Sequence, residues 1–213
     1  MAAVTALVTA GGKGTRMRDV RGEKPLVPLL GRPMIEWVLD AISSSGGVDR
    51  LCVSVSANAP LTQDLLEGRG FETIMTSGTD YVADLRQAMS HLRSRDVLIC
   101  PADMPLLTPQ GVSEVLDSYR CQGVASLSVA VALSVVRKVG AVPSFSFELG
   151  GQEVALCGIS VVDRDLMLTG ETLSQGFMVT EDEQFALNVN TREELSRAEA
   201  LLRRREHGPM DHK

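Results

Sequence analysis

Short apolar runs rich in Val, Ile and Leu alternate with segments of helical periodicity in the first half of the chain. Nearly continuous apolar runs predict strands at residues 3–9, 50–56, 71–77 and 96–103. Helical spacing predicts helices from Pro33 to the Gly46-Gly47 pair and at residues 61–67, 80–92 and 109–120. This alternation indicates an α/β fold with a mixed, mostly parallel sheet that helices cover on both faces.

The second half of the chain has a different pattern, with glycine turns and fewer helical segments. Residues 126–136 and 142–162 are interpreted as strands. Residues 185–205 are expected to form a short strand and then a helix, which Thr191 caps and Glu194 closes as a capping box. No repeat, low-complexity segment or linker divides the chain, so residues 1–213 are predicted to form a single domain.

Residues 7–26, "LVTAGGKGTRMRDVRGEKPL", follow the first predicted strand and combine glycines with five basic side chains. A glycine loop after a buried strand typically binds phosphate, because its backbone N–H groups are free to contact an anion. The P-loop pattern is absent, and Met17 stands where the dinucleotide pattern needs its third glycine. Both standard phosphate loops are therefore excluded, and a solvated charged turn stays open as the simpler interpretation.

The charge of the whole chain restricts the ligand of this loop. A net charge of -6 and a pI near 5.1 argue against a general nucleic-acid binder, which needs a broad basic face. Lys13, Arg16 and Lys24 suit a compact, highly charged anion such as a nucleoside triphosphate. We therefore expect local binding of a small anion and no nucleic-acid partner.

Other classes of site find little support. The four cysteines show no CxxC spacing and the three histidines are scattered, so a zinc site, a disulfide framework and a Cys–His nucleophile are not expected. No apolar run approaches the ~20 residues that span a bilayer. The apolar residues 1–10 lack a preceding basic segment and run into the glycine loop, so we expect a buried strand and a cytoplasmic protein.

The motifs together resemble those of a known enzyme family. "LVTAGGKGTRM" and "EKPLVPLLGRPM" are similar to the opening signature of the nucleotidyltransferases. "SGTDYVADL" (77–85), "PADMPLL" (101–107) and "LNVNTREELSRAEALL" (187–202) resemble, more narrowly, the archaeal adenosylcobinamide-phosphate guanylyltransferases. The molybdenum-cofactor guanylyltransferases share much of this pattern. The resemblance implies a Rossmann-like fold and GMP transfer from GTP to adenosylcobinamide phosphate, with pyrophosphate released.

The resemblance also implies roles for particular residues. Arg16, Lys24 and Asp103 would be catalytic, and Asp103 and Asn190 would hold Mg²⁺. Gly158 would lie beside the acceptor phosphate. The nucleotide-binding residues would be Ala10, Gly11, Gly12, Lys13, Gly14, Thr15, Arg16, Lys24, Ser56, Asn58, Ser77 and Gly78. A phosphate acceptor is already anionic near neutral pH, so the lack of a catalytic histidine fits this chemistry.

Three alternatives remain open at this point. The acceptor could be molybdopterin or a sugar phosphate, since aromatic residues are few and predict no obvious platform for a corrinoid. The protein could bind a nucleotide without turnover. Asp103 and Asn190 are also ordinary turn and capping residues when each is taken alone. The sequence does not predict the oligomeric state.

Overall fold

The computed structural model describes residues 3–12, 14, 22–143 and 145–207. The strands are β1 (Val4–Thr9), β2 (Pro28–Leu29), β3 (Arg32–Pro33), β4 (Arg50–Ser56), β5 (Glu72–Thr76), β6 (Asp96–Pro101), β7 (Ser126–Ala132), β8 (Phe147–Leu149), β9 (Gln152–Asp163) and β10 (Gln175–Thr180). The α-helices are α1 (Met34–Ser43), α2 (Pro60–Gly68), α3 (Tyr81–His91), α4 (Pro109–Gln122), α5 (Leu133–Lys138), α6 (Arg164–Thr169) and α7 (Arg192–His207). Short 3-10 helices lie at Lys24–Leu26 and Glu183–Phe185.

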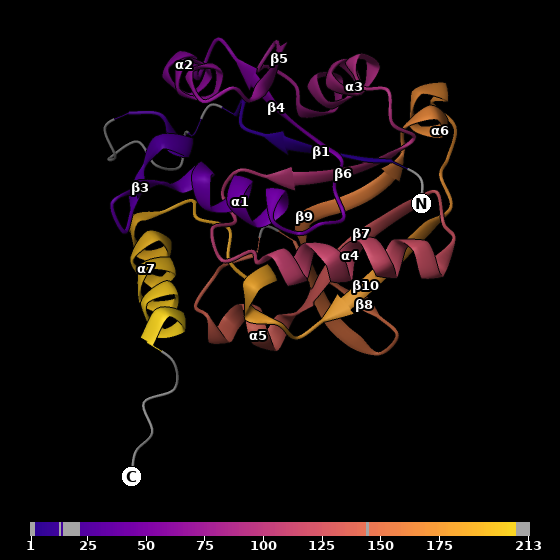
Figure 1. The fold of residues 1–213 in the computed structure, drawn as a ribbon. Helices are drawn as coiled ribbons and strands as arrows, with labels where there is room; N and C mark the ends of the chain where they lie inside the picture. The colour runs from indigo at the N-terminus through magenta and orange to yellow at the C-terminus, as the bar shows by residue number, and fades with distance from the viewer. Residues whose placement is uncertain (1–2, 13, 15–21, 144, 208–213) are drawn as a thin grey trace.

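One eight-stranded sheet in the described residues runs through both halves of the chain (Figure 1). The strand order is β10-β7-β9-β6-β1-β4-β5, and β8 pairs with β9 outside this path. Strands β6, β1, β4 and β5 are parallel to one another, as are β7 and β10, whereas β9 is antiparallel to β6, β7 and β8. The predicted mixed, mostly parallel sheet is therefore confirmed.

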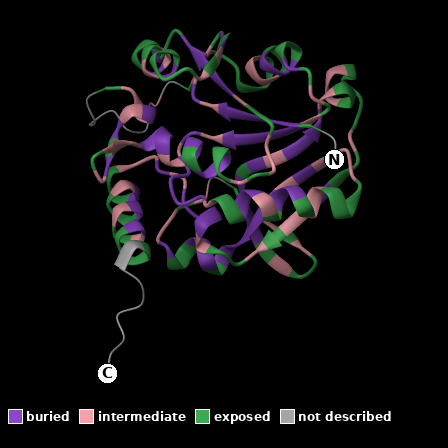
Figure 2. Cartoon of the chain, viewed as in Figure 1, coloured by how far each residue is buried: buried purple, intermediate pink, exposed green. Residues whose placement is uncertain are grey.

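The central strands are mostly buried (Figure 2), and their alternate residues face opposite sides of the sheet. In β1, Val4, Ala6 and Val8 belong to the large core that includes α1 and α4, whereas Leu7 belongs to the smaller core with α3. Met167 and Leu168 of α6 also pack against that smaller core. Burial on both faces explains why β1 carries no charged residue and why its two polar residues are both threonines.

Two predictions for the second half of the chain are wrong. The expected strand at 126–136 ends at Ala132, and α5 begins at Leu133, because buried residues at helical spacing follow; a short apolar run does not distinguish the two structures. The expected strand after residue 185 is an irregular segment, in which the Val189 N–H donates to the Asp103 carbonyl at 2.9 Å without forming a ladder. Helix α6 and strand β10 had no counterpart in the sequence analysis.

The helices that surround the sheet are all short. Within the described residues, no helix has the length and the apolar character needed to cross a membrane.

The cysteines belong to the core, with one exception. Cys52, Cys100 and Cys157 are buried and Cys121 is exposed, and all four are free thiols. Burial raises the pKa of Cys52 to about 11 and that of Cys157 to about 12, and it also raises the pKa of Cys100. The three buried thiols therefore stay protonated in the folded protein well above the pH at which an exposed thiol ionises.

Alkaline pH is expected to destabilise the fold through these thiols. The unfolded chain loses its thiol protons near pH 8.5, so the free energy of unfolding should be greatest below that pH and fall as the pH rises toward 11. The limiting slope is about 1.4 kcal/mol per pH unit for each buried thiol. Urea unfolding between pH 8 and pH 11 tests this. Cys52→Ala should flatten the profile, Cys121→Ser should not, and an unchanged Cys52→Ala profile would contradict the assignment.

Candidate active site

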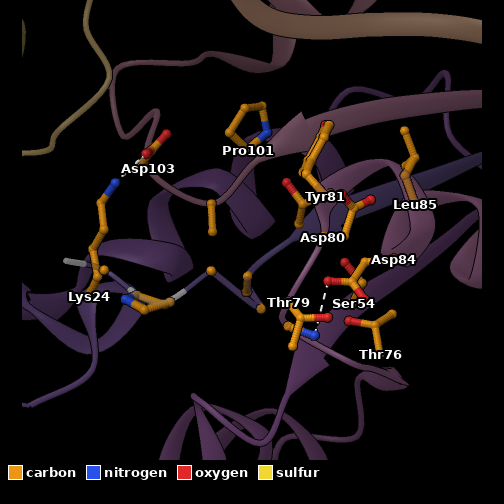
Figure 3. A pocket seen from close by; sticks show the side chains of 18 of the residues that line it. Lys24, Ser54, Thr76, Thr79, Asp80, Tyr81, Asp84, Leu85, Pro101 and Asp103 are labelled. Carbon is orange, nitrogen blue, oxygen red and sulfur yellow. Dashed lines mark hydrogen bonds and ion pairs between the residues drawn. The ribbon is translucent and has the colours of Figure 1, made fainter. Parts of the chain in front are cut away.

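A cavity of about 530 Å³ lies at the carboxyl ends of β1, β4, β5 and β6, which is where α/β sheets bind ligands. Lys24 and Asp103 lie at one end of it, and the first turn of α3 lies at the other (Figure 3). Of the predicted site residues, those that line the cavity are Ala10, Gly11, Gly12, Gly14, Lys24, Gly78, Asp103 and Asn190. Lys13, Thr15 and Arg16 lie outside the described residues.

The glycine loop approaches β4 too closely for larger residues. The Ala10 N–H donates to the Ser54 carbonyl at 2.8 Å. A Cβ at Gly11 would lie 3.3 Å from the Ser56 Cβ and from the Val55 carbonyl carbon. Gly14 has a φ of +58°, in the left-handed region that glycine adopts readily. These constraints favour glycine at positions 11 and 14 and hold the loop backbone at the cavity wall.

Lys24, Asp103 and Asn190 form one polar cluster, although they come from three separate parts of the chain. The Lys24 Nζ donates to Asp103 Oδ2 and, at 2.8 Å, to Asn190 Oδ1. The Lys24 and Asp103 side chains are 16% and 18% exposed, so the ion pair is mostly desolvated but still reaches the cavity. Asp103 Oδ2 and Asn190 Oδ1 therefore both point at the single positive charge of the Lys24 ammonium group.

Asn188 holds this cluster in place, and the sequence analysis did not identify it. Its Nδ2 donates to Asp103 Oδ1 at 2.9 Å and to the Cys157 carbonyl at 3.2 Å. Its own carbonyl accepts from Asn190 Nδ2 at 3.2 Å. Asn188 thus connects β9, the end of β6 and the segment before α7. The Asn-x-Asn spacing was visible in the sequence, but the contact with Asp103 was not.

The start of α7 also fixes Asn190. The Thr191 Oγ1 accepts from the Glu194 N–H at 3.2 Å, which confirms the predicted cap. The Glu194 carboxylate accepts from the Asn190 N–H at 2.7 Å, one residue before the position that a capping box requires. The cap therefore orients the cluster as well as ending the helix.

Glu23 anchors the residue next to Lys24, a second contact that the sequence analysis missed. Its carboxylate accepts from the Leu61 N–H at 2.7 Å and from the Thr62 N–H at 2.6 Å, at the amino end of α2. Thr62 Oγ1 also donates to it at 2.5 Å. A carboxylate is favourable at a helix amino terminus. Because Lys24 is the next residue, this cap fixes the position of Lys24 at the cavity.

Ser56, Asn58 and Ser77 do not line the cavity but hold the loops that do. The Ser56 Oγ donates to the Gly11 carbonyl at 2.7 Å. The Asn58 Nδ2 donates to the Gly78 carbonyl at 3.1 Å. The Ser77 Oγ and the Gly78 N–H both donate to the Asp84 carboxylate, at 2.7 and 3.0 Å. These residues connect the glycine loop to the turn after β5.

Gly78→Ala is expected to destabilise the protein by about 2–4 kcal/mol. The φ of Gly78 is +70°, and an added Cβ would lie 2.3 Å from Asn58 Nδ2 and 2.5 Å from Ser56 Oγ. Gly46 has a nearly identical φ of +69° but open space around it, so Gly46→Ala isolates the cost of the backbone conformation. Urea unfolding of both variants tests this, and equal losses would contradict the steric argument.

Helix α3 supplies the wall of the cavity opposite Lys24. Asp80 caps this helix by accepting from the Ala83 N–H at 2.7 Å, and Tyr81 and Leu85 line the cavity. Desolvation raises the pKa of Tyr81. The sequence analysis placed Asp80 and Tyr81 in a resembling motif without giving either of them a role in ligand binding.

Gly158 lies outside the cavity, beside its wall. Its φ is +91°, and an added Cβ would lie 2.9 Å from the Cγ of Pro101, which lines the cavity. The preceding carbonyl, that of Cys157, accepts from Asn188. Gly158 is therefore next to the site without being part of its surface.

The polar cluster has the donor chemistry of a Mg²⁺ site that a substrate completes. In the described part of the chain, no group of three or more His, Cys, Asp or Glu side chains could hold a metal ion by itself. Asp103 and Asn190 do present two oxygens to a single cationic position, which Lys24 Nζ occupies. Mg²⁺ is commonly held by one or two carboxylates together with substrate phosphates, and these residues fit that arrangement.

Comparisons with known proteins agree with this geometry. The MobA-like NTP transferase domain family matches residues 6–143. The chain is 31% identical over 204 residues to the adenosylcobinamide-phosphate guanylyltransferase of Methanocaldococcus jannaschii, a match that covers 93% of this chain and 97% of that protein. It is 33% identical over 131 residues to the bifunctional protein GlmU of an Exiguobacterium species, but this match covers only 61% of this chain and 28% of GlmU.

Solved structures show the same fold at lower sequence identity. A hypothetical transferase from Thermus thermophilus has a TM-score of 0.69 and 21% identity, with 91% of this chain and 99% of that chain covered. A CMP:2-keto-3-deoxy-manno-octonic acid synthetase complexed with CTP has a TM-score of 0.68 and 17% identity, with coverage of 96% and 99%.

Proposed function

This chain belongs to the MobA-like NTP transferase domain family, and from that premise we propose that it transfers GMP from GTP to adenosylcobinamide phosphate. The products would be adenosylcobinamide-GDP and pyrophosphate. The similarity to the Methanocaldococcus jannaschii enzyme supports this acceptor, because it extends over nearly the whole of both chains. The similarity to GlmU covers less of this chain and only 28% of GlmU. A sugar phosphate stays the first alternative acceptor. Molybdopterin stays the second alternative.

The observation that carries the proposal is the Lys24–Asp103–Asn190 cluster at one end of a cavity whose wall is a glycine loop. The loop amides would bind the triphosphate, and Lys24 would stabilise the charge that develops as pyrophosphate leaves. The cavity would align the acceptor phosphate for in-line attack at the α-phosphorus. An anionic acceptor needs no general base, and the described cavity lining contains no histidine.

Residues Asp103 and Asn190 would hold Mg²⁺, which when bound would supply positive charge to the phosphates. Arg16 and Lys13 are proposed to complete the basic side of the triphosphate site. Ser56, Asn58 and Ser77 are proposed to shape the nucleotide site through the loops that they hold, with Gly78 at its surface. A cytoplasmic location belongs to the same proposal, because nucleoside triphosphates and reduced thiols are both found there.

The proposal is tested by measuring pyrophosphate release with each of the four ribonucleoside triphosphates and each of three acceptors. The acceptors are adenosylcobinamide phosphate, glucose 1-phosphate and molybdopterin. Release is expected only with GTP and the corrinoid, and it should stop when EDTA removes Mg²⁺. Release with another acceptor would keep the nucleotidyltransferase chemistry and replace the substrate. GTP binding with no release for any acceptor would favour a protein without turnover.

A further inference from the structure

Partly exposed apolar side chains gather on one face of the sheet at β7, β8, β9 and β10. Three of the five phenylalanines of the chain lie close together there. The ring centroids of Phe145 and Phe147 are 6.0 Å apart, and those of Phe147 and Phe177 are 5.8 Å apart. Two further apolar side chains, Leu156 and Val179, are 47% and 44% exposed. We call Phe145, Phe147, Leu156, Phe177 and Val179 the apolar strip.

Strand register places the strip on one face. Residues paired across neighbouring strands lie on the same side of a sheet. Phe147 pairs with Val154, two residues from Leu156, and Leu156 pairs with Ala130, which in turn pairs with Val179. The intervening face positions in β7 and β9 are small or buried, and none of the described residues on this face of β7–β10 is charged. The result is an uncharged surface in which Ser128, Ser160 and Gln175 lie among the apolar side chains.

The same face leads into the nucleotide cavity. Val97 and Ile99 of β6 pack with α3 on this side of the sheet. Pro101, two residues after Ile99 in the same strand, faces the same side and lines the cavity. Pro101 Cγ is the atom that an added Cβ at Gly158 would touch, and Gly158 follows Leu156 by two residues on the same face. The apolar strip therefore continues past Gly158 and Pro101 to the wall of the cavity that holds Asp103.

We propose that the apolar strip binds the ring system of the phosphate acceptor, whose phosphate reaches past Gly158 to the cavity. This inference rests on the proposed function. The occupant that it names is a large, flat and mostly uncharged ring body with one phosphate. A small sugar phosphate has no apolar body to cover the strip, whereas a corrinoid does. The glycine at position 158 keeps the passage open, because a side chain there would meet Pro101.

The test replaces two partly exposed side chains, in the double variant Leu156→Thr and Val179→Thr. Met75→Thr on β5 is the matched control, because Met75 is also a strand residue with 47% exposure but lies away from the strip. Equilibrium dialysis measures binding of adenosylcobinamide phosphate by its visible absorbance, and calorimetry measures binding of GTP. The double variant should bind the corrinoid at least about tenfold more weakly and GTP equally well, and the control should match the wild type.

Each other outcome has a definite meaning. Equal corrinoid binding by the double variant and the wild type would overturn this inference and leave the proposed function intact. No corrinoid binding by the wild type would overturn the proposed acceptor and the inference with it. Light scattering that shows a wild-type dimer and a monomeric variant would assign the strip to a second copy of the chain. If the double variant fails to fold, Phe145→Ser, at a position that is 70% exposed, replaces it in the same measurements.

Discussion

Asp103→Asn is expected to lower the rate of nucleotidyl transfer by at least about a thousandfold and to leave GTP binding nearly unchanged. Asp103 Oδ1 must still accept from Asn188, so the new amide nitrogen would take the place of Oδ2. That nitrogen would face the Lys24 ammonium, which is also a donor. The substitution therefore removes the negative charge and the metal-binding oxygen together, while the fold around β6 keeps its contacts.

The measurement is single-turnover transfer with saturating GTP, together with calorimetric binding of GTP. Asp96→Asn is the control, because Asp96 is at the opposite end of β6, where it accepts from the Tyr119 hydroxyl at 3.2 Å. Its transfer rate should equal that of the wild type. A fully active Asp103→Asn variant would remove Asp103 from the site.

Lys24→Met is expected to lower kcat/KM for GTP by about a hundredfold to a thousandfold. The variant loses the cation proposed to stabilise the leaving pyrophosphate, and it leaves the Asp103 carboxylate, 18% exposed, without its partner. Lys24→Arg should recover only part of the activity, because a planar guanidinium cannot replace a single nitrogen between Asp103 Oδ2 and Asn190 Oδ1.

Combining the two substitutions tests whether Lys24 and Asp103 act as a unit. The Lys24→Met/Asp103→Asn double variant should be scarcely less active than the worse single variant, because residues in direct contact lose their function together. Urea unfolding should show the double variant to be more stable than Lys24→Met alone, since it buries no unpaired carboxylate. If the free-energy losses of the two single variants summed to that of the double variant, the result would contradict a shared role for Lys24 and Asp103.

The sequence predicted the first half of the fold well because its elements carry strong local signals. The run at residues 3–9 is buried on both faces of the sheet, so it carries no charged residue, and its only polar side chains are those of Thr5 and Thr9. The error at Leu133 arose where a strand passes directly into a helix without a glycine or proline between them. Residues 187–190 look like a strand, but their backbone contacts Asp103 and Glu194 instead of a ladder.

The candidate site was predicted only where a residue belonged to a motif. Lys24, Asp103 and Asn190 were named from motifs, and the structure brings them together in one cluster. Asn188 and Glu23 were missed because each acts through a contact with a residue that is distant in the sequence. Asn188 contacts Asp103, which is 85 positions away, and Glu23 contacts Leu61, which is 38 positions away. The aromatic content suggested no platform for a ring, since a composition cannot show that three phenylalanines gather on one face.

The measurement that tests the central claim most directly follows the phosphorus atoms of GTP. The wild-type protein is incubated with Mg²⁺, adenosylcobinamide phosphate and GTP labelled with ³²P at either the α or the γ position. The account predicts that the α label enters the corrinoid product and that the γ label leaves as pyrophosphate in equal amount. A γ label transferred to the acceptor or released as inorganic phosphate would contradict nucleotidyl transfer at this site.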